Sequence, residues 1–151
     1  MDKIDVIGFF LLGISTRTSN ANGQSAKDIG GLWNRFMNDK VLDQIEDRVS
    51  DDIYCVYTDY ESDHNGAYTT VLGCKVNDID NIPEGLTSLT VAPAGYIKYT
   101  AKGKLPDAVA QTWQHIWNSS IDREYMADFD VYGAKAWNQE AAEVDVYVGV
   151  K

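Results

Sequence analysis

The sequence predicts an α+β fold in which two β-α-β-β units are related by pseudo-two-fold symmetry, with antiparallel sheets, two main helices and a cleft between the units. Three observations predict it. Two segments have the apolar spacing of amphipathic helices, the other apolar segments are β-branched or alternate with polar residues, and the order strand, helix, strand, strand occurs twice. The repeat assigns residues 1–77 to the first unit and residues 86–151 to the second, within one domain spanning residues 1–151.

The first unit contains a strand, a helix and a hairpin. A strand is predicted over residues 4–14, and the helix after it begins with a capping box of Ser25 and Asp28. Two alternating segments, residues 53–60 and 68–76, flank Asn65-Gly66 and predict a hairpin with one face under the helix. The helix stripe is Ile29, Leu32, Trp33, Phe36, Met37 and Val41, and the helix-covered hairpin face is Ile53, Cys55, Tyr57, Leu72, Cys74 and Val76.

The second unit repeats these elements in the same order. Strands predicted over residues 86–91 and 95–101 precede a second amphipathic helix, and short strands follow at residues 129–132 and 144–150. Trp113 matches Trp33 of the first helix, and Tyr132 matches Tyr57 of the first hairpin, so the repeat keeps its register. The stripe of the second helix is Leu105, Ala108, Val109, Thr112, Trp113, Ile116 and Trp117.

Composition excludes several classes of protein. A net charge of -10 and a pI near 4.4 leave no basic stripe for phosphates, so direct binding of nucleic acid is not expected. The apolar run at residues 6–14 is less than half of the roughly 20 residues that a membrane span needs. Asp2 and Asp5 precede this run, where a signal peptide carries positive charge. We therefore expect a cytoplasmic protein without a membrane span.

The sequence carries no motif for a metal, a cofactor or a catalytic nucleophile. Cys55 and Cys74 lack metal-ligand spacing and are expected as free thiols on paired strands, although the hairpin would also let them face each other. His64 and His115 are isolated, and there is no GxSxG, GxGxxG or P-loop. We expect no cofactor and no metal, and assign no catalytic residue.

Asp130 lies inside the short apolar strand Phe129-Asp130-Val131-Tyr132. A buried acid there must pair, take up a proton or meet a ligand. Tyrosines cluster around the first hairpin, and a carboxylate among aromatic rings suits an organic cation, with about 0.5–2 kcal/mol for each cation–π contact. The alternative interpretations are structural: Asp130 lies at a solvated strand edge, the tyrosines are ordinary strand residues and the tryptophans pack the core.

The repeat and four motifs together resemble the gyrase-inhibitor-like effector-binding domain, which is fused to AraC-type and MerR-type multidrug regulators and also occurs alone. Among stand-alone members, the chain is similar to a cationic-drug-binding protein carried on an integron cassette. The likeness covers nearly the whole chain. The motifs are Val91-Ala92-Pro93-Ala94-Gly95-Tyr96, the helix from Trp113 to Trp117, Asp128-Phe129-Asp130-Val131-Tyr132 and Val144-Asp145-Val146-Tyr147-Val148.

This resemblance implies a cleft between the units, lined by aromatic side chains and an acid that contacts cationic ligands. Asp130 occupies the acidic position of the family's Phe-Glu-x-Tyr motif and is one methylene shorter than the usual Glu. Tyr147 matches a pocket tyrosine of the final strand. The remaining candidates are hairpin tyrosines and helix tryptophans that form either pocket wall or core: Tyr57, Tyr60, Tyr68, Trp113 and Trp33.

The resulting hypothesis is a stand-alone binding protein for cationic, amphipathic aromatic compounds such as drugs and dyes, without a DNA-binding domain of its own, because the chain starts at once with the first strand. A hydrolase of small reactive electrophiles on the same fold is the alternative, as is a protein-interaction or transcription-regulating module acting in trans. The expected partners are cationic small molecules, with a protein partner and a homodimer through edge strands left open.

Overall fold

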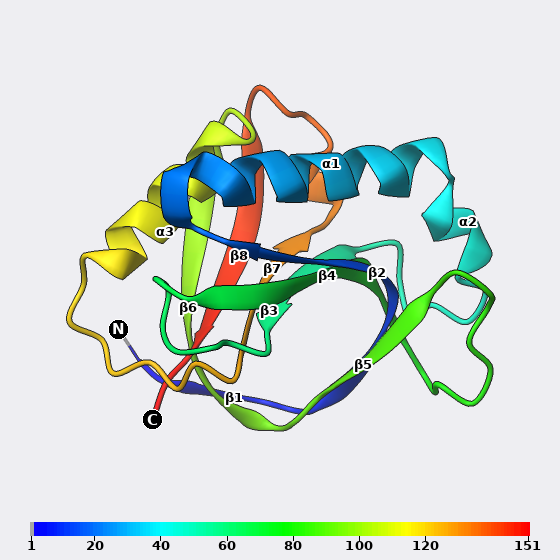
Figure 1. The fold of residues 1–151 in the computed structure, drawn as a ribbon, viewed down its shortest axis with the longest axis horizontal. Coiled ribbons are helices and arrows are strands. Elements are labelled where there is room, and N and C mark those ends of the chain that lie inside the picture. Colours follow the sequence, from blue (N-terminus) through cyan, green and yellow to red (C-terminus); the bar gives the residue numbers. More distant parts are fainter. Residues whose placement is uncertain (1) are drawn as a thin grey trace.

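Eight antiparallel strands form one curled sheet, and two main helices cover the same face of it (Figure 1). This computed structural model describes residues 2–151. The elements in chain order are β1 (Ile4–Val6), β2 (Phe9–Ser19), η1 (Ala21–Gly23), α1 (Gln24–Asn38), α2 (Val41–Gln44), β3 (Ile53–Thr58), β4 (Ala67–Val76), β5 (Thr87–Val91), β6 (Ala94–Gly103), α3 (Asp107–Trp117), β7 (Ala127–Tyr132), η2 (Ala134–Ala136) and β8 (Ala142–Gly149).

The order of strands across the sheet is β1-β6-β8-β7-β3-β4-β2-β5. The group β6-β8-β7 mirrors the group β2-β4-β3, and each group consists of the long strand and the hairpin of one unit. The groups meet where β7 pairs with β3, and Cys55 is the partner of Asp130 at this junction. The short strands β1 and β5 pair with the long strand of the other unit. The antiparallel sheets expected from the sequence are therefore one continuous sheet.

The two main helices form where the apolar stripes predict them, with differences at their ends. α1 begins at Gln24 after Gly23, and no side chain caps it, so the predicted capping box is wrong. Its buried residues are Leu32 and Phe36, whereas Met37 is exposed and does not belong to the packed stripe. The strand predicted over residues 4–14 is broken into β1 and β2.

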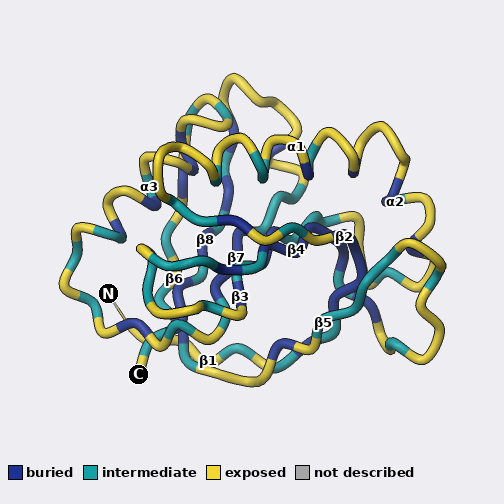
Figure 2. Tube along the Cα trace, viewed as in Figure 1, coloured by how far each residue is buried: buried dark blue, intermediate teal, exposed yellow. Residues whose placement is uncertain are grey.

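The sheet buries side chains on both of its faces. Under α1 and α3 lie two apolar clusters, one for each unit, and a third cluster lies on the opposite face. Buried residues accordingly recur along the strands of the sheet, whereas the loops and the outer side of α1 are mostly exposed (Figure 2). Within residues 2–151, no helix is long and apolar enough to cross a membrane. The central strands β7 and β3 thus present one face to the space between the two helices.

Candidate functional site

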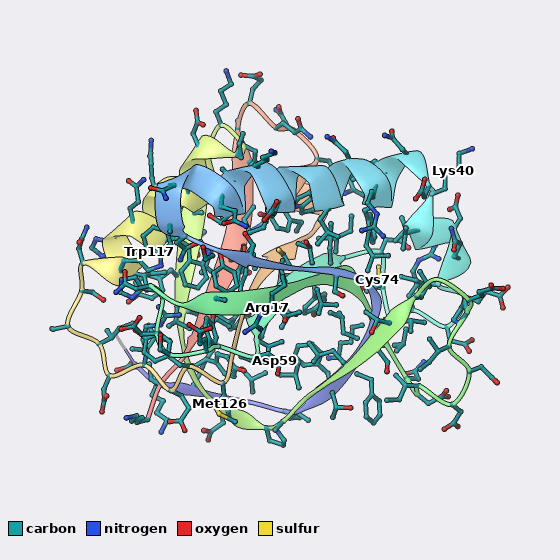
Figure 3. The ribbon with its side chains drawn as sticks, viewed as in Figure 1. Arg17, Lys40, Asp59, Cys74, Trp117 and Met126 are labelled. Carbon is teal, nitrogen blue, oxygen red and sulfur yellow. The ribbon has the colours of Figure 1, made fainter. Side chains whose placement is uncertain are left out.

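A cavity of about 450 Å³ lies between α1 and α3, over the face of β3, β4 and β7 that these helices cover. α3 borders the cavity along its length and ends at Trp117, which lies across the molecule from Lys40, a residue between α1 and α2 (Figure 3). Small residues of α1, Ala26 and Gly30, leave room for the cavity, and nothing lies within 4 Å of a Cβ built on Gly30. The aromatic lining residues are Trp33, Tyr57, Tyr60, Tyr68, Trp113, Trp117 and Tyr132.

The cavity lies on the seam between the repeats. Trp33 and Trp113, which match each other in sequence, enter it from the two helices. Tyr57 and Tyr132, the matched pair of the hairpins, enter it from the two central strands. The Trp33 and Tyr132 rings pack edge to face, with centroids 4.8 Å apart, and the Trp113 and Tyr57 rings pack in the same way at 5.4 Å. Equivalent side chains of both units therefore build its walls.

Asp130 lies directly beneath this aromatic wall and is fully buried. The Tyr57 hydroxyl donates a hydrogen bond to Oδ2 over 2.6 Å, and the Trp113 indole Nε1 donates to Oδ1 over 3.0 Å. Burial raises the pKa of Asp130 to about 7, although both hydrogen bonds favour the ionised form. Burial also raises the pKa of Tyr57 well above its usual value, so its hydroxyl stays a donor.

A second buried acid, Asp128, lies two residues earlier on the same face of β7 and has a different environment. Arg123 donates to its Oδ2 over 2.8 Å, Tyr60 donates to the same oxygen, and the backbone N–H of Gly149 donates to Oδ1 over 2.7 Å. Burial raises the pKa of Asp128, whereas Arg123 and these hydrogen bonds act in the opposite direction. Of the two acids, Asp128 has a cationic partner inside the protein; within residues 2–151 no basic group pairs with Asp130.

The loop between β3 and β4 closes one side of the cavity. The His64 ring stacks on Trp117, with centroids 5.7 Å apart and planes 6° from parallel. Asn20 donates to the His64 carbonyl over 2.8 Å and accepts from the Tyr68 hydroxyl over 2.6 Å. These contacts connect the loop to α3 and to the segment before α1, so the wall is continuous from one helix to the other.

Comparison with known proteins identifies the family. Residues 5–150 match the family described as Cass2, integron-associated effector binding protein. This chain belongs to the Cass2 family. The Cass2 chain is also 30% identical over 146 residues to YobU, a candidate transcriptional regulator of Bacillus subtilis (strain 168), covering 92% of this chain and 90% of YobU. The expected resemblance to an effector-binding domain is confirmed.

Solved structures share the fold of this Cass2 chain. The integron cassette protein VCH_CASS2 of Vibrio cholerae is 23% identical, with a TM-score of 0.74, 99% of this chain covered and 95% of that one. SAV2435 bound to tetraphenylphosphonium is 19% identical, with a TM-score of 0.81, 99% of this chain covered and 93% of that one. At these identities the similarity establishes the fold, and it agrees with the α+β class predicted from the sequence.

The structure brings together most of the side chains that the sequence singled out. Trp33, Tyr57, Tyr60, Tyr68 and Trp113 line the cavity of this Cass2 chain, and Asp130 lies behind two of them.

Tyr147, expected in the cleft, lies on the opposite face of the sheet, stacked on Phe129 at 4.7 Å between centroids. Side chains alternate along β8, and Val146 and Val148 take the helix-covered face, which leaves Tyr147 on the other one.

Sequence reasoning missed other residues of the site. Tyr132 and Trp117 could have been found, because the first matches Tyr57 in the repeat and the second is on the predicted stripe. Strand alternation around Asp130 also puts Asp128 on the same face. Arg123 lies in the irregular segment between α3 and β7, where no periodic pattern points to it.

Proposed function

We propose that this effector-binding protein takes aromatic organic cations into the cavity between α1 and α3, with Asp130 supplying the opposite charge. The observation that carries the proposal is the state of Asp130. It is fully buried, accepts hydrogen bonds only from Tyr57 and Trp113, and has no basic partner in the part of the chain described.

A cationic ligand would supply the positively charged partner that the Asp130 carboxyl group lacks. Ionisation of a buried acid is costly without a nearby positive charge, as the raised pKa of Asp130 reflects. A cation resting on the rings of Tyr57 and Trp113 would lie one side chain away from the carboxylate, in an environment of low dielectric. The same rings offer their faces for cation–π contacts. Asp130 would then act through the aromatic side chains that it holds.

Two further facts support a cationic ligand. SAV2435, which has the same fold, binds tetraphenylphosphonium, a lipophilic cation with four aromatic rings. The net charge of -10 also favours the approach of cations over anions at low ionic strength.

Tetraphenylphosphonium and tetraphenylborate form a suitable probe pair, because they share a shape and carry opposite charges. Tryptophan fluorescence or calorimetry should show saturable binding of tetraphenylphosphonium and at least tenfold weaker binding of tetraphenylborate. Asp130→Asn keeps the size of the side chain, removes its charge and should weaken phosphonium binding at least tenfold, or about 1.4 kcal/mol.

Asp145→Asn is the matched control. Asp145 is partly exposed, lies on the face of β8 away from the helices and pairs with Lys98 at 3.7 Å, and its substitution changes the net charge by the same amount. Phosphonium affinity should stay within twofold of the wild type in this variant. Equal binding of both probes, or equal losses in both variants, would overturn the proposal. Chemical conversion of an electrophilic probe would instead support the hydrolase alternative.

A further inference from the structure

Arg123 has hydrogen-bonding capacity that the protein leaves unused. Its side chain is 5% exposed and forms part of the cavity wall. One nitrogen, Nη2, donates to Asp128, but Nε and Nη1 are buried without a hydrogen-bond partner. Leaving a buried donor without a hydrogen bond is unfavourable, and more so for a charged group. Such an arrangement calls for an explanation.

Aromatic rings hold the guanidinium in this position. Its central carbon lies 4.3 Å from the ring centroid of Tyr125, 5.5 Å from that of Trp113 and 6.0 Å from that of Tyr60. These rings offer cation–π contacts, which do not replace directed hydrogen-bond acceptors. They also shield both free nitrogens from water. Tyr125, the nearest ring, is half-buried and does not line the cavity, whereas Tyr60 and Trp113 line it together with Arg123.

We propose that Arg123 is a second polar subsite of the cavity, which binds an acceptor oxygen, a carbonyl or a carboxylate, of the effector. The inference rests on the proposed function and narrows it. The effector would carry a cationic aromatic group at the Asp130 end and an acceptor oxygen at the Arg123 end. Nε and Nη1 lie on different edges of the guanidinium, so each is a separate donor and the effector oxygen would bond to one of them.

The two subsites are close enough for one small molecule. Trp113 links them, since its indole nitrogen bonds to Asp130 and its ring lies 5.5 Å from the Arg123 guanidinium. Asp128, which holds Arg123, is two residues from Asp130 on β7, a separation of about 7 Å along a strand. A cation and an oxygen separated by a short chain would therefore reach both.

Three phosphonium salts with one cationic head test this subsite: butyltriphenylphosphonium, (4-carboxybutyl)triphenylphosphonium and the methyl ester of the latter. We expect the carboxylate to bind at least fivefold more tightly than the butyl compound, and the ester at least twofold. The net charge of -10 works against the carboxylate, so its preference would indicate a local contact. A preference shared by the ester would identify a carbonyl contact, and one confined to the acid a carboxylate contact.

Arg123→Lys tests whether this residue makes the contact. Lysine keeps a positive charge beside Asp128 but lacks the directed Nε–H and Nη1–H donors of the guanidinium, so the ratio of ester to butyl affinity should fall to about one. If the variant does not fold, the side-chain N–H resonances of Arg123 in the wild type provide the test. One of them should shift downfield with the ester or the acid, and all should stay in place with the butyl compound.

The outcomes separate this inference from the proposed function. Failure of butyltriphenylphosphonium to bind the wild type would overturn the proposed function. Binding of all three salts with equal affinity would leave that function in place and overturn the acceptor subsite, because the aromatic rings alone would then satisfy the guanidinium. A wild-type preference for the ester over the butyl compound that persists unchanged in Arg123→Lys would also overturn the acceptor subsite.

Discussion

In the ligand-free wild type, ionisation of Asp130 should lower the free energy of unfolding between about pH 4 and pH 7. Asp130→Asn should remove this pH dependence, so the variant should gain stability relative to the wild type as the pH rises. In the folded protein, burial raises the pKa of Asp130 from an ordinary 3.8 to about 7. The unfolded chain has the ordinary value. Between these values the folded state binds a proton that the unfolded state has lost, so the free energy of unfolding falls as the pH rises.

The structure sets the size of this effect. Each tenfold difference in proton affinity is worth about 1.4 kcal/mol, so a pKa of about 7 in place of 3.8 corresponds to about 4 kcal/mol. This contribution is fully present below about pH 4 and is lost once the pH exceeds about 7. Asparagine cannot ionise and removes the whole dependence. Its amide can disturb one of the hydrogen bonds from Tyr57 and Trp113, a cost that is the same at every pH and cancels in the slope.

Urea unfolding at intervals from pH 4 to pH 8 measures this difference. The free energy of unfolding of Asp130→Asn minus that of the wild type should rise by about 4 kcal/mol from pH 4 to pH 8. Asp145→Asn, which removes a partly exposed carboxylate, serves as the control and should follow the wild type closely. A gap between Asp130→Asn and wild type that stays constant with pH would refute the reasoning, because Asp130 would then ionise as freely in the folded state as in the unfolded state.

Three other consequences can be measured. Tyr57→Phe removes a donor to the ionised form of Asp130 and should move the midpoint of the pH profile upward by about one to two pH units; an unchanged midpoint would show that this hydrogen bond does not favour the anion. Gly73→Ala should destabilise the protein by about 2 kcal/mol or more, since its Cβ would overlap the backbone of β2, whereas Gly30→Ala has free space and should be neutral or stabilising in urea unfolding. Both cysteine thiols are buried, and burial raises the pKa of each, so a thiol reagent should label them only in denaturant; labelling of the native protein would contradict their burial.

Local patterns predicted the parts of the fold that depend on local sequence. The helices carry their own apolar stripes, so α1 and α3 could be placed from spacing alone. The repeat predicted that Trp33 and Trp113 are equivalent, and both line the cavity. The joining of the units into one sheet depends on the pairing of β3 with β7, which are separated by about half of the chain. No periodicity within either strand specifies that partner.

Only part of the candidate site could be predicted from the sequence. An acid in the apolar strand around Asp130 was a clear signal, because burying a carboxylate without a reason is unfavourable. Tyr147 was assigned by family resemblance, although the alternation of valines in β8 places it on the other face. Arg123 could not be found, since its position depends on contacts with Asp128 and Tyr125 that form only after folding.

The central claim is that Asp130 supplies the charge that holds a cationic ligand. The most direct test is the affinity for tetraphenylphosphonium at pH 6 and pH 8, in the wild type and in Asp130→Asn. With a pKa of about 7, Asp130 is ionised about tenfold more at pH 8 than at pH 6, so the wild type should bind about tenfold more tightly at pH 8 and the variant should bind weakly at both. Wild-type affinity that does not change with pH, or an equal pH dependence in Asp130→Asn, would contradict the claim.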